Sequence, residues 1–107
     1  MTQAYISIGS NIEAKKNIAK VKKKLNQLFI CTFSDNFYTE AEGFEGQDFI
    51  NLVAGFETSL DAVKLTQTLK TLEKKMGRES NQKGMHDRVI DLDLILFGDL
   101  IAQDQGI

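Results

Sequence analysis

The sequence predicts an α+β fold with the element order βαββαβ, the order of ferredoxin-like domains. In that fold an antiparallel sheet carries two helices on one face. Four segments predict strands, because they alternate apolar with polar residues or are rich in β-branched and large apolar residues. Two other segments repeat apolar residues every three or four positions, as amphipathic helices do.

The first strand is expected at residues 3–8, where apolar and polar residues alternate. The Gly-Ser-Asn run at 9–11 ends it. Ser10 and Glu13 fit the S-x-x-E capping box, so a helix is expected to start near Asn11. The apolar stripe of this helix consists of Ile18, Val21, Leu25 and Leu28.

The second and third strands are expected at residues 29–40 and 49–56, separated by a polar loop. The second strand contains an irregularity at 34–36. Either Ser59 or Asp61 can cap the second helix. The apolar stripe of that helix consists of Leu65, Leu69, Leu72 and Met76, and Gly77 follows it.

Gly77 is expected to end the second helix in the left-handed conformation. The fourth strand is expected at residues 88–98, before a short tail. This last strand completes the predicted antiparallel sheet.

Composition describes an ordinary globular chain, with 42% apolar and 26% charged residues. Its 107 residues suffice for a single domain, residues 1–107, with one core. The net charge of −2 gives no general attraction to nucleic acid or membrane, and no apolar run forms a signal peptide or a membrane span. The lone Cys31 cannot form an internal disulfide, so the cytoplasm is the expected location. Its position among Phe29, Ile30 and Phe33 predicts a buried structural thiol.

The segment Arg-Val-Ile-Asp-Leu-Asp-Leu-Ile-Leu-Phe-Gly at 88–98 carries the strongest functional signal. Side chains on a strand alternate between faces, so Asp91 and Asp93 point the same way, about 6–7 Å apart. Two such carboxylates repel each other and need a compensating positive charge. Because Mg²⁺ binds one or two carboxylates together with phosphate oxygens, the pair suggests a metal–phosphate site. The alternative is the solvated face of a half-exposed edge strand.

Basic residues upstream of the aspartates favour the metal–phosphate interpretation. They lie in a segment rich in Gly, Ser and Asn, where cationic side chains can reach a bound polyphosphate. These residues are Arg78, Lys83, His86 and Arg88.

Taken together, the segments resemble the 6-hydroxymethyl-7,8-dihydropterin pyrophosphokinase (HPPK) family of folate biosynthesis. The likeness is carried by the order and spacing of several motifs along nearly the whole chain. They are Ala-Tyr-Ile-Ser-Ile-Gly-Ser-Asn at 4–11, Phe-Tyr-Thr-Glu at 37–40, Gln-Asp-Phe-Ile-Asn at 47–51, Glu-Thr-Ser-Leu at 57–60, Leu-Glu at 72–73, Gly-Arg at 77–78 and the segment 88–98.

The resemblance implies a cytoplasmic transferase that moves pyrophosphate from ATP to the hydroxymethyl group of the pterin and releases AMP. It implies that Asp91 and Asp93 hold two Mg²⁺ ions that bridge the ATP phosphates. It also makes Arg78 and Arg88 catalytic phosphate contacts. Positioning and electrostatics would then supply most of the rate.

Three further roles follow from the resemblance. Asn51 would hydrogen-bond the pterin, Phe49 would line the pterin pocket, and Glu73 would lie near the nucleotide. Each has a plain structural alternative: Asn51 as a strand-edge residue, Phe49 as a core residue, and Glu73 as an ordinary surface residue among lysines. For Arg78, which follows the helix end, the alternative is an interaction with the helix dipole.

The chain departs from the family after the signature strand. Family members continue for half as long again, with basic and aromatic groups at the phosphates and the pterin, so residues 1–107 are expected to be an HPPK-like domain without that extension. His86 departs from the family pattern and receives no role. An enzyme of this family, with full or weakened activity, is therefore the leading hypothesis. The alternative is an inactive paralogue that binds pterin, nucleotide or a protein partner.

An RNA-binding domain of the same fold is disfavoured, because the acidic strand lacks the basic and aromatic surface that such sheets use. The sequence leaves open whether the protein is a monomer or a homo-oligomer, and whether the chain is a full gene product.

Overall fold

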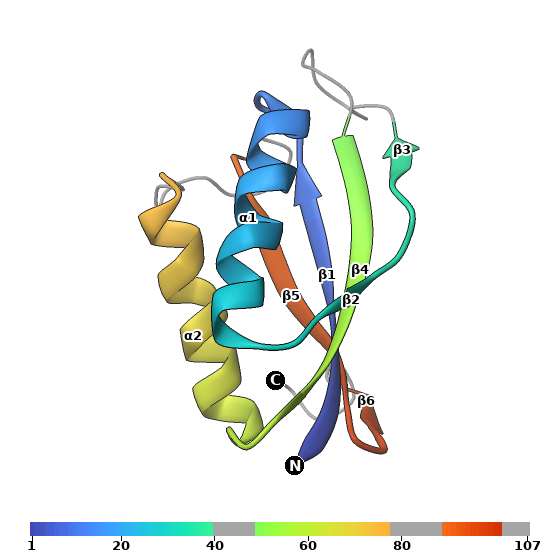
Figure 1. Ribbon diagram of the computed structural model, residues 1–107, viewed down its shortest axis with the longest axis vertical. Helices are drawn as coiled ribbons and strands as arrows, with labels where there is room; N and C mark the ends of the chain where they lie inside the picture. The colour runs from blue at the N-terminus through green and yellow to red at the C-terminus, as the bar shows by residue number, and fades with distance from the viewer. Residues whose placement is uncertain (40–48, 78–88, 102–107) are drawn as a thin grey trace.

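The structure is a computed structural model that describes residues 1–39, 49–77 and 89–101. Within these residues it has two helices and a six-stranded sheet, which confirms the predicted α+β fold (Figure 1). The elements are β1 (Thr2–Ser10), α1 (Ala14–Leu28), β2 (Thr32–Phe33), β3 (Phe37–Thr39), β4 (Phe49–Thr58), α2 (Ala62–Lys75), β5 (Asp91–Phe97) and β6 (Leu100–Ile101).

All described strand pairs are antiparallel, in the order β2-β4-β1-β5-β6, with β3 also paired to β4. β1 is central and pairs with β4 along its whole length, from Thr2 opposite Thr58 to Ser10 opposite Ile50. β2 and β3 together occupy one position beside β4. The strands therefore follow the ferredoxin-like arrangement, in which the first strand lies between the third and the fourth.

The single strand predicted at 29–40 is divided into β2 and β3, and Ser34 lies at the division. Its main-chain N–H donates to the Val53 carbonyl at 2.8 Å, while its hydroxyl accepts from the Val53 N–H at 2.8 Å. A side-chain oxygen thus replaces a main-chain carbonyl at this point of the ladder, so the regular pairing stops and resumes at β3.

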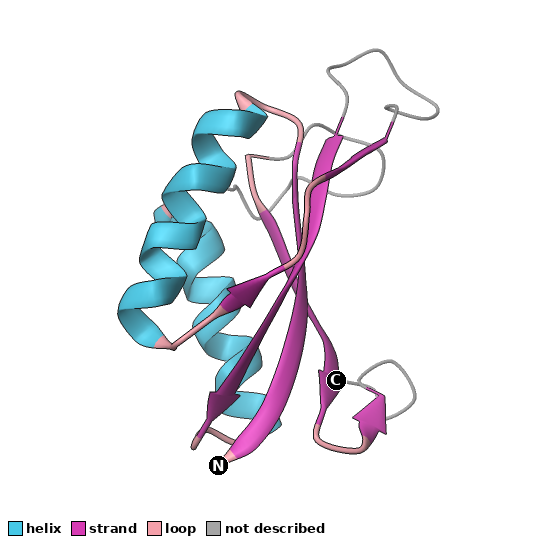
Figure 2. Cartoon of the chain, turned by 45° about the vertical axis from the view of Figure 1, so that its right-hand side comes forward, coloured by secondary structure: helices cyan, strands magenta, loops and turns pink. Residues whose placement is uncertain are grey.

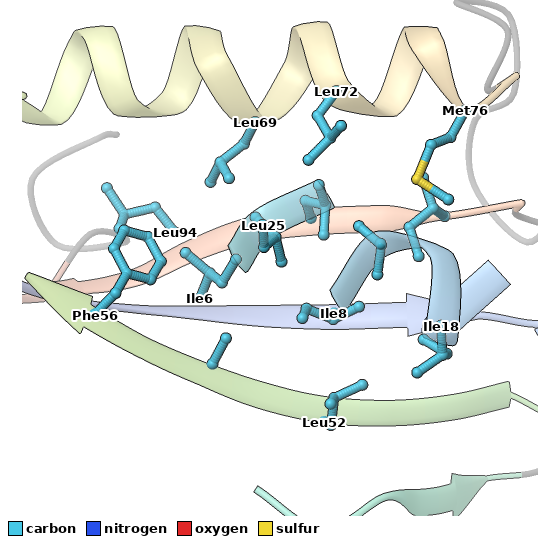
Figure 3. Packing of buried hydrophobic residues seen from close by; sticks show 14 of the residues in the cluster. Ile6, Ile8, Ile18, Leu25, Leu52, Phe56, Leu69, Leu72, Met76 and Leu94 are labelled. Carbon is cyan, nitrogen blue, oxygen red and sulfur yellow. The ribbon is translucent and has the colours of Figure 1, made fainter. Parts of the chain in front are cut away.

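Both helices pack on the same face of the sheet (Figures 1 and 2). Leu69 and Leu72 of α2 point toward the sheet, where β1 carries Ile6 and Ile8, and Met76 just after α2 points the same way (Figure 3). Every residue of the stripe predicted for the second helix is buried. In α1, Leu28 is the exception to the prediction, because this residue of the last turn is 54% exposed.

Two predicted helix-end signals are present at α2. Asp61 is its N-cap, and its carboxylate accepts the Lys64 N–H at 2.8 Å, so Asp61 rather than Ser59 is the cap. Gly77 follows with φ of 99°, a conformation that glycine adopts without a Cβ clash.

The capping box predicted at Ser10 is wrong. α1 begins at Ala14 with Glu13 as N-cap, in the left-handed region at φ 41°, and no side chain caps it. Ser10 is instead the last residue of β1, and its buried hydroxyl donates to the Val89 carbonyl at 2.5 Å. That bond ties the end of β1 to the start of the segment bearing the aspartates.

The fourth strand is shorter than predicted, because β5 begins at Asp91. Gly98, with φ of 59°, turns the chain, and part of the expected tail pairs back as β6. No helix among the described residues is long and apolar enough to cross a membrane.

Candidate active site on the open face of the sheet

Asp91 and Asp93 lie on the face of β5 opposite the helices. The alternate residues Leu92 and Leu94 are buried in the core, so the period of the strand places both aspartates on the other face, as predicted. Asp91 is half-buried, and the side chain of Asp93 is 54% exposed. Neither aspartate is buried in the apolar core, so both can reach a ligand above the sheet.

Asn51 shares this open face with the aspartates, across the central strand. Gly9 of β1 pairs with Asn51 on one side and with Asp91 on the other. A Cβ built at Gly9 would lie 2.9 Å from Asn51 Oδ1, so the Asn51 amide extends over this glycine. Its Nδ2 donates to Thr39 Oγ1 at 2.9 Å. The sequence did not predict that Gly9 leaves room for the Asn51 side chain.

Phe49 lies two residues before Asn51 on the same strand face, opposite Thr39. It is half-buried and does not belong to the core cluster of the described residues. The interpretation of Phe49 as a core residue alone is therefore wrong. β1 separates β4 from β5, so about 10 Å of sheet lies between the Phe49–Asn51 side and the aspartates.

Glu73 is neither exposed nor an ordinary surface residue: it is only 3% exposed. Its Oε2 accepts the Leu92 N–H at 2.6 Å and lies 3.4 Å from Lys70 Nζ. Glu73 therefore holds the residue between the two aspartates. The i, i+3 spacing of Lys70 and Glu73 was the one sign in the sequence that Glu73 could have a charged partner. Only the packing of α2 beside β5 shows that Glu73 also accepts the Leu92 N–H.

Arg78 and Arg88, predicted to contact phosphate, lie outside the described residues, as do Lys83 and His86. The phosphate-binding role of both arginines therefore stays a prediction.

The donor set suits a hard cation held jointly with a phosphate ligand. No group of three or more His, Cys, Asp or Glu side chains that could hold a metal occurs among the described residues. Asp91 and Asp93 offer only carboxylate oxygens, and Mg²⁺ characteristically takes one or two carboxylates and completes its shell with water and phosphate oxygens. The residues fit such an ion.

Two of the surface hollows lie away from the candidate residues. One, of about 490 Å³, is bounded by the end of α1 and by β4, and another, of about 500 Å³, lies between Leu28 and α2. Neither is lined by the candidate residues. Cys31 lies close to the first hollow along the chain and is half-buried, not buried as predicted. This partial burial raises the pKa of its thiol.

Fold and site together define a small ferredoxin-like domain with a carboxylate pair and an amide on the open face of its sheet. The family model described as 7,8-dihydro-6-hydroxymethylpterin-pyrophosphokinase (HPPK) matches residues 5–105. The chain belongs to this family, which confirms the resemblance seen in its motifs.

Relatives from three species carry the name 2-amino-4-hydroxy-6-hydroxymethyldihydropteridine pyrophosphokinase. The protein from Haemophilus influenzae is 32% identical over 98% of this chain and 68% of its own length. Those from Porphyromonas gingivalis and Bacillus subtilis are 28% and 29% identical, over 90% and 88% of this chain and 69% and 59% of their own lengths.

Proposed function

We propose that this protein transfers pyrophosphate from ATP to the hydroxymethyl group of 6-hydroxymethyl-7,8-dihydropterin in a Mg²⁺-dependent reaction that releases AMP. The observation that carries the proposal is the pairing of Asp91 with Gly9 and of Gly9 with Asn51, which puts a carboxylate and an amide on one open face. Membership of a family named for this reaction supports it. The cytoplasm is the expected setting, because ATP is the donor.

Asp91 and Asp93 would hold two Mg²⁺ ions. Bound there, the metal would neutralise charge on the ATP phosphates. The protein contributes a rigid strand that presents both carboxylates on one face and keeps them there through the bonds of Leu92 to α2. Because phosphoryl-type transfer depends mainly on positioning and electrostatics, this rigidity is the chief contribution of the described residues.

Asn51 would bind the pterin and Phe49 would line its pocket. An amide carries both donor and acceptor atoms, as an aminopterin edge requires. Arg78 and Arg88 would contact phosphates, and Glu73 would lie near the nucleotide.

The direct test is AMP formation from ATP and 6-hydroxymethyl-7,8-dihydropterin, with Mg²⁺ and with excess EDTA. We expect AMP only with Mg²⁺ and only when both substrates are present. A folded protein that binds Mg²⁺–ATP but releases no AMP would indicate the binding module that the sequence left as an alternative. AMP release without pterin would point to a different acceptor.

Gly9→Ala is expected to lower pterin affinity about tenfold. The new Cβ would lie 2.9 Å from Asn51 Oδ1 and displace the amide, and the loss of one hydrogen bond to the pterin accounts for a change of this size. Calorimetric titration with the pterin measures the effect. Gly55→Ala is the matched control: its Cβ meets the Tyr5 ring at 2.8 Å, elsewhere on the same face. Equal affinity losses in both variants would contradict a specific role for the Gly9–Asn51 contact.

A further inference from the structure

Lys70 of α2 reaches the candidate metal site from the open edge of β5. Its ammonium lies 3.4 Å from Asp93 Oδ1, 3.3 Å from the Leu92 carbonyl oxygen and 3.4 Å from Glu73 Oε2. The lysine side chain is 46% exposed, so it can also leave this position.

The pairing of β5 with β1 explains why the ammonium lies there. Leu92 is opposite Ile8, and its N–H and C=O bond to Glu73 and Lys70 instead of to β1. This is the non-hydrogen-bonded position of an antiparallel pair, where both main-chain groups point away from the partner strand. The Lys70 ammonium is therefore held beside Asp93 by the Leu92 carbonyl and the Glu73 carboxylate as well as by Asp93 itself.

A divalent cation bound by Asp93 would have to compete with that ammonium. Two cations this close repel each other, and the carboxylate oxygen that accepts from Lys70 is one that a metal would use. A polyphosphate arriving with the metal changes the balance, because its oxygens offer the lysine a new acceptor of higher charge.

We propose that Lys70 is a positioning residue that occupies Asp93 in the metal-free protein and yields it to a metal ion that arrives with a polyphosphate. The proposal rests on the proposed function, since it takes the aspartates as metal ligands. Its consequence is that metal and nucleotide bind with positive coupling: each strengthens the other, and Lys70 supplies part of the coupling.

The test is titration at low salt, first with Mn²⁺ alone and then with Mn²⁺–ATP. The electron paramagnetic resonance signal of the free ion measures binding in each titration. We expect Lys70→Gln to bind Mn²⁺ alone about two- to fivefold more tightly than the wild type, the range for removal of an exposed competing ion pair. Its affinity for Mn²⁺–ATP should be unchanged or lower. Lys70→Arg, which keeps the charge, should behave like the wild type.

Lys74→Gln is the matched control, because it removes the same charge from an exposed position of the same helix. If Lys70→Gln and Lys74→Gln bind Mn²⁺ alike, the proposal for Lys70 is overturned while the metal site stands. If Asp91→Asn binds Mn²⁺ with the same affinity as the wild type, the metal site itself is overturned. A gain in metal affinity cannot arise from unfolding, and thermal unfolding of each variant checks that the fold is kept.

Discussion

Asp91→Ala or Asp93→Ala is expected to abolish measurable Mg²⁺–ATP binding and to lower AMP formation about a hundredfold or more. Each carboxylate would supply several kcal/mol of metal-borne charge stabilisation, and each 1.36 kcal/mol is a tenfold change in rate. Both side chains lie on the open face, outside the core, so the fold should persist. Calorimetry with Mg²⁺–ATP, the AMP assay and circular dichroism measure the three effects.

Neither alanine variant is expected to change stability much. Removing Asp91 relieves carboxylate repulsion but also removes the interaction that Asp91 itself makes, so its thermal midpoint should stay close to that of the wild type. Removing Asp93 also breaks the exposed Lys70 pair, which is worth at most about 1 kcal/mol, so the two changes should offset each other.

Asp99→Ala is the control for the aspartate variants, because Asp99 is an exposed residue between β5 and β6. It should leave nucleotide binding intact. Undiminished nucleotide binding in both the Asp91 and Asp93 variants would refute the metal-site interpretation.

Glu73→Ala is expected to lower the free energy of unfolding by about 2 kcal/mol, because it leaves the buried Leu92 N–H without its acceptor. For a domain of this size, the thermal midpoint should fall by about 8–16 °C. Differential scanning calorimetry measures both quantities. Mg²⁺–ATP affinity should fall as well, since Leu92 lies between the two aspartates and loses its anchor on α2.

Glu73→Gln separates the structural role of Glu73 from its predicted place near the nucleotide. The glutamine carbonyl can still accept the Leu92 N–H, so most of the stability should return. If nucleotide affinity stays low in this stable variant, the carboxylate charge itself matters for binding. Glu57→Ala, at an exposed position of β4, is the control, and equal stability of Glu57→Ala and Glu73→Ala would show that the buried carboxylate does not hold β5.

The sequence by itself determined the features that depend on local periodicity. Alternation along a strand placed Asp91 and Asp93 on one face, and the three- and four-residue spacing placed the Leu65–Met76 stripe in the core. Gly77 marked the end of α2, and the sequence limited the N-cap to Ser59 or Asp61, because capping and left-handed turns involve only neighbouring residues. The motif order was also sufficient to indicate the family.

Only the tertiary structure decided which distant groups meet. The position of the Asn51 amide over Gly9 depends on the register of β4 with β1, and residues far apart in sequence set that register. The surface interpretation of Glu73 and the capping prediction for Ser10 failed for one reason. Both side chains bond main-chain groups of the segment 89–92, and which of those groups lack a strand partner is known only once the sheet has assembled.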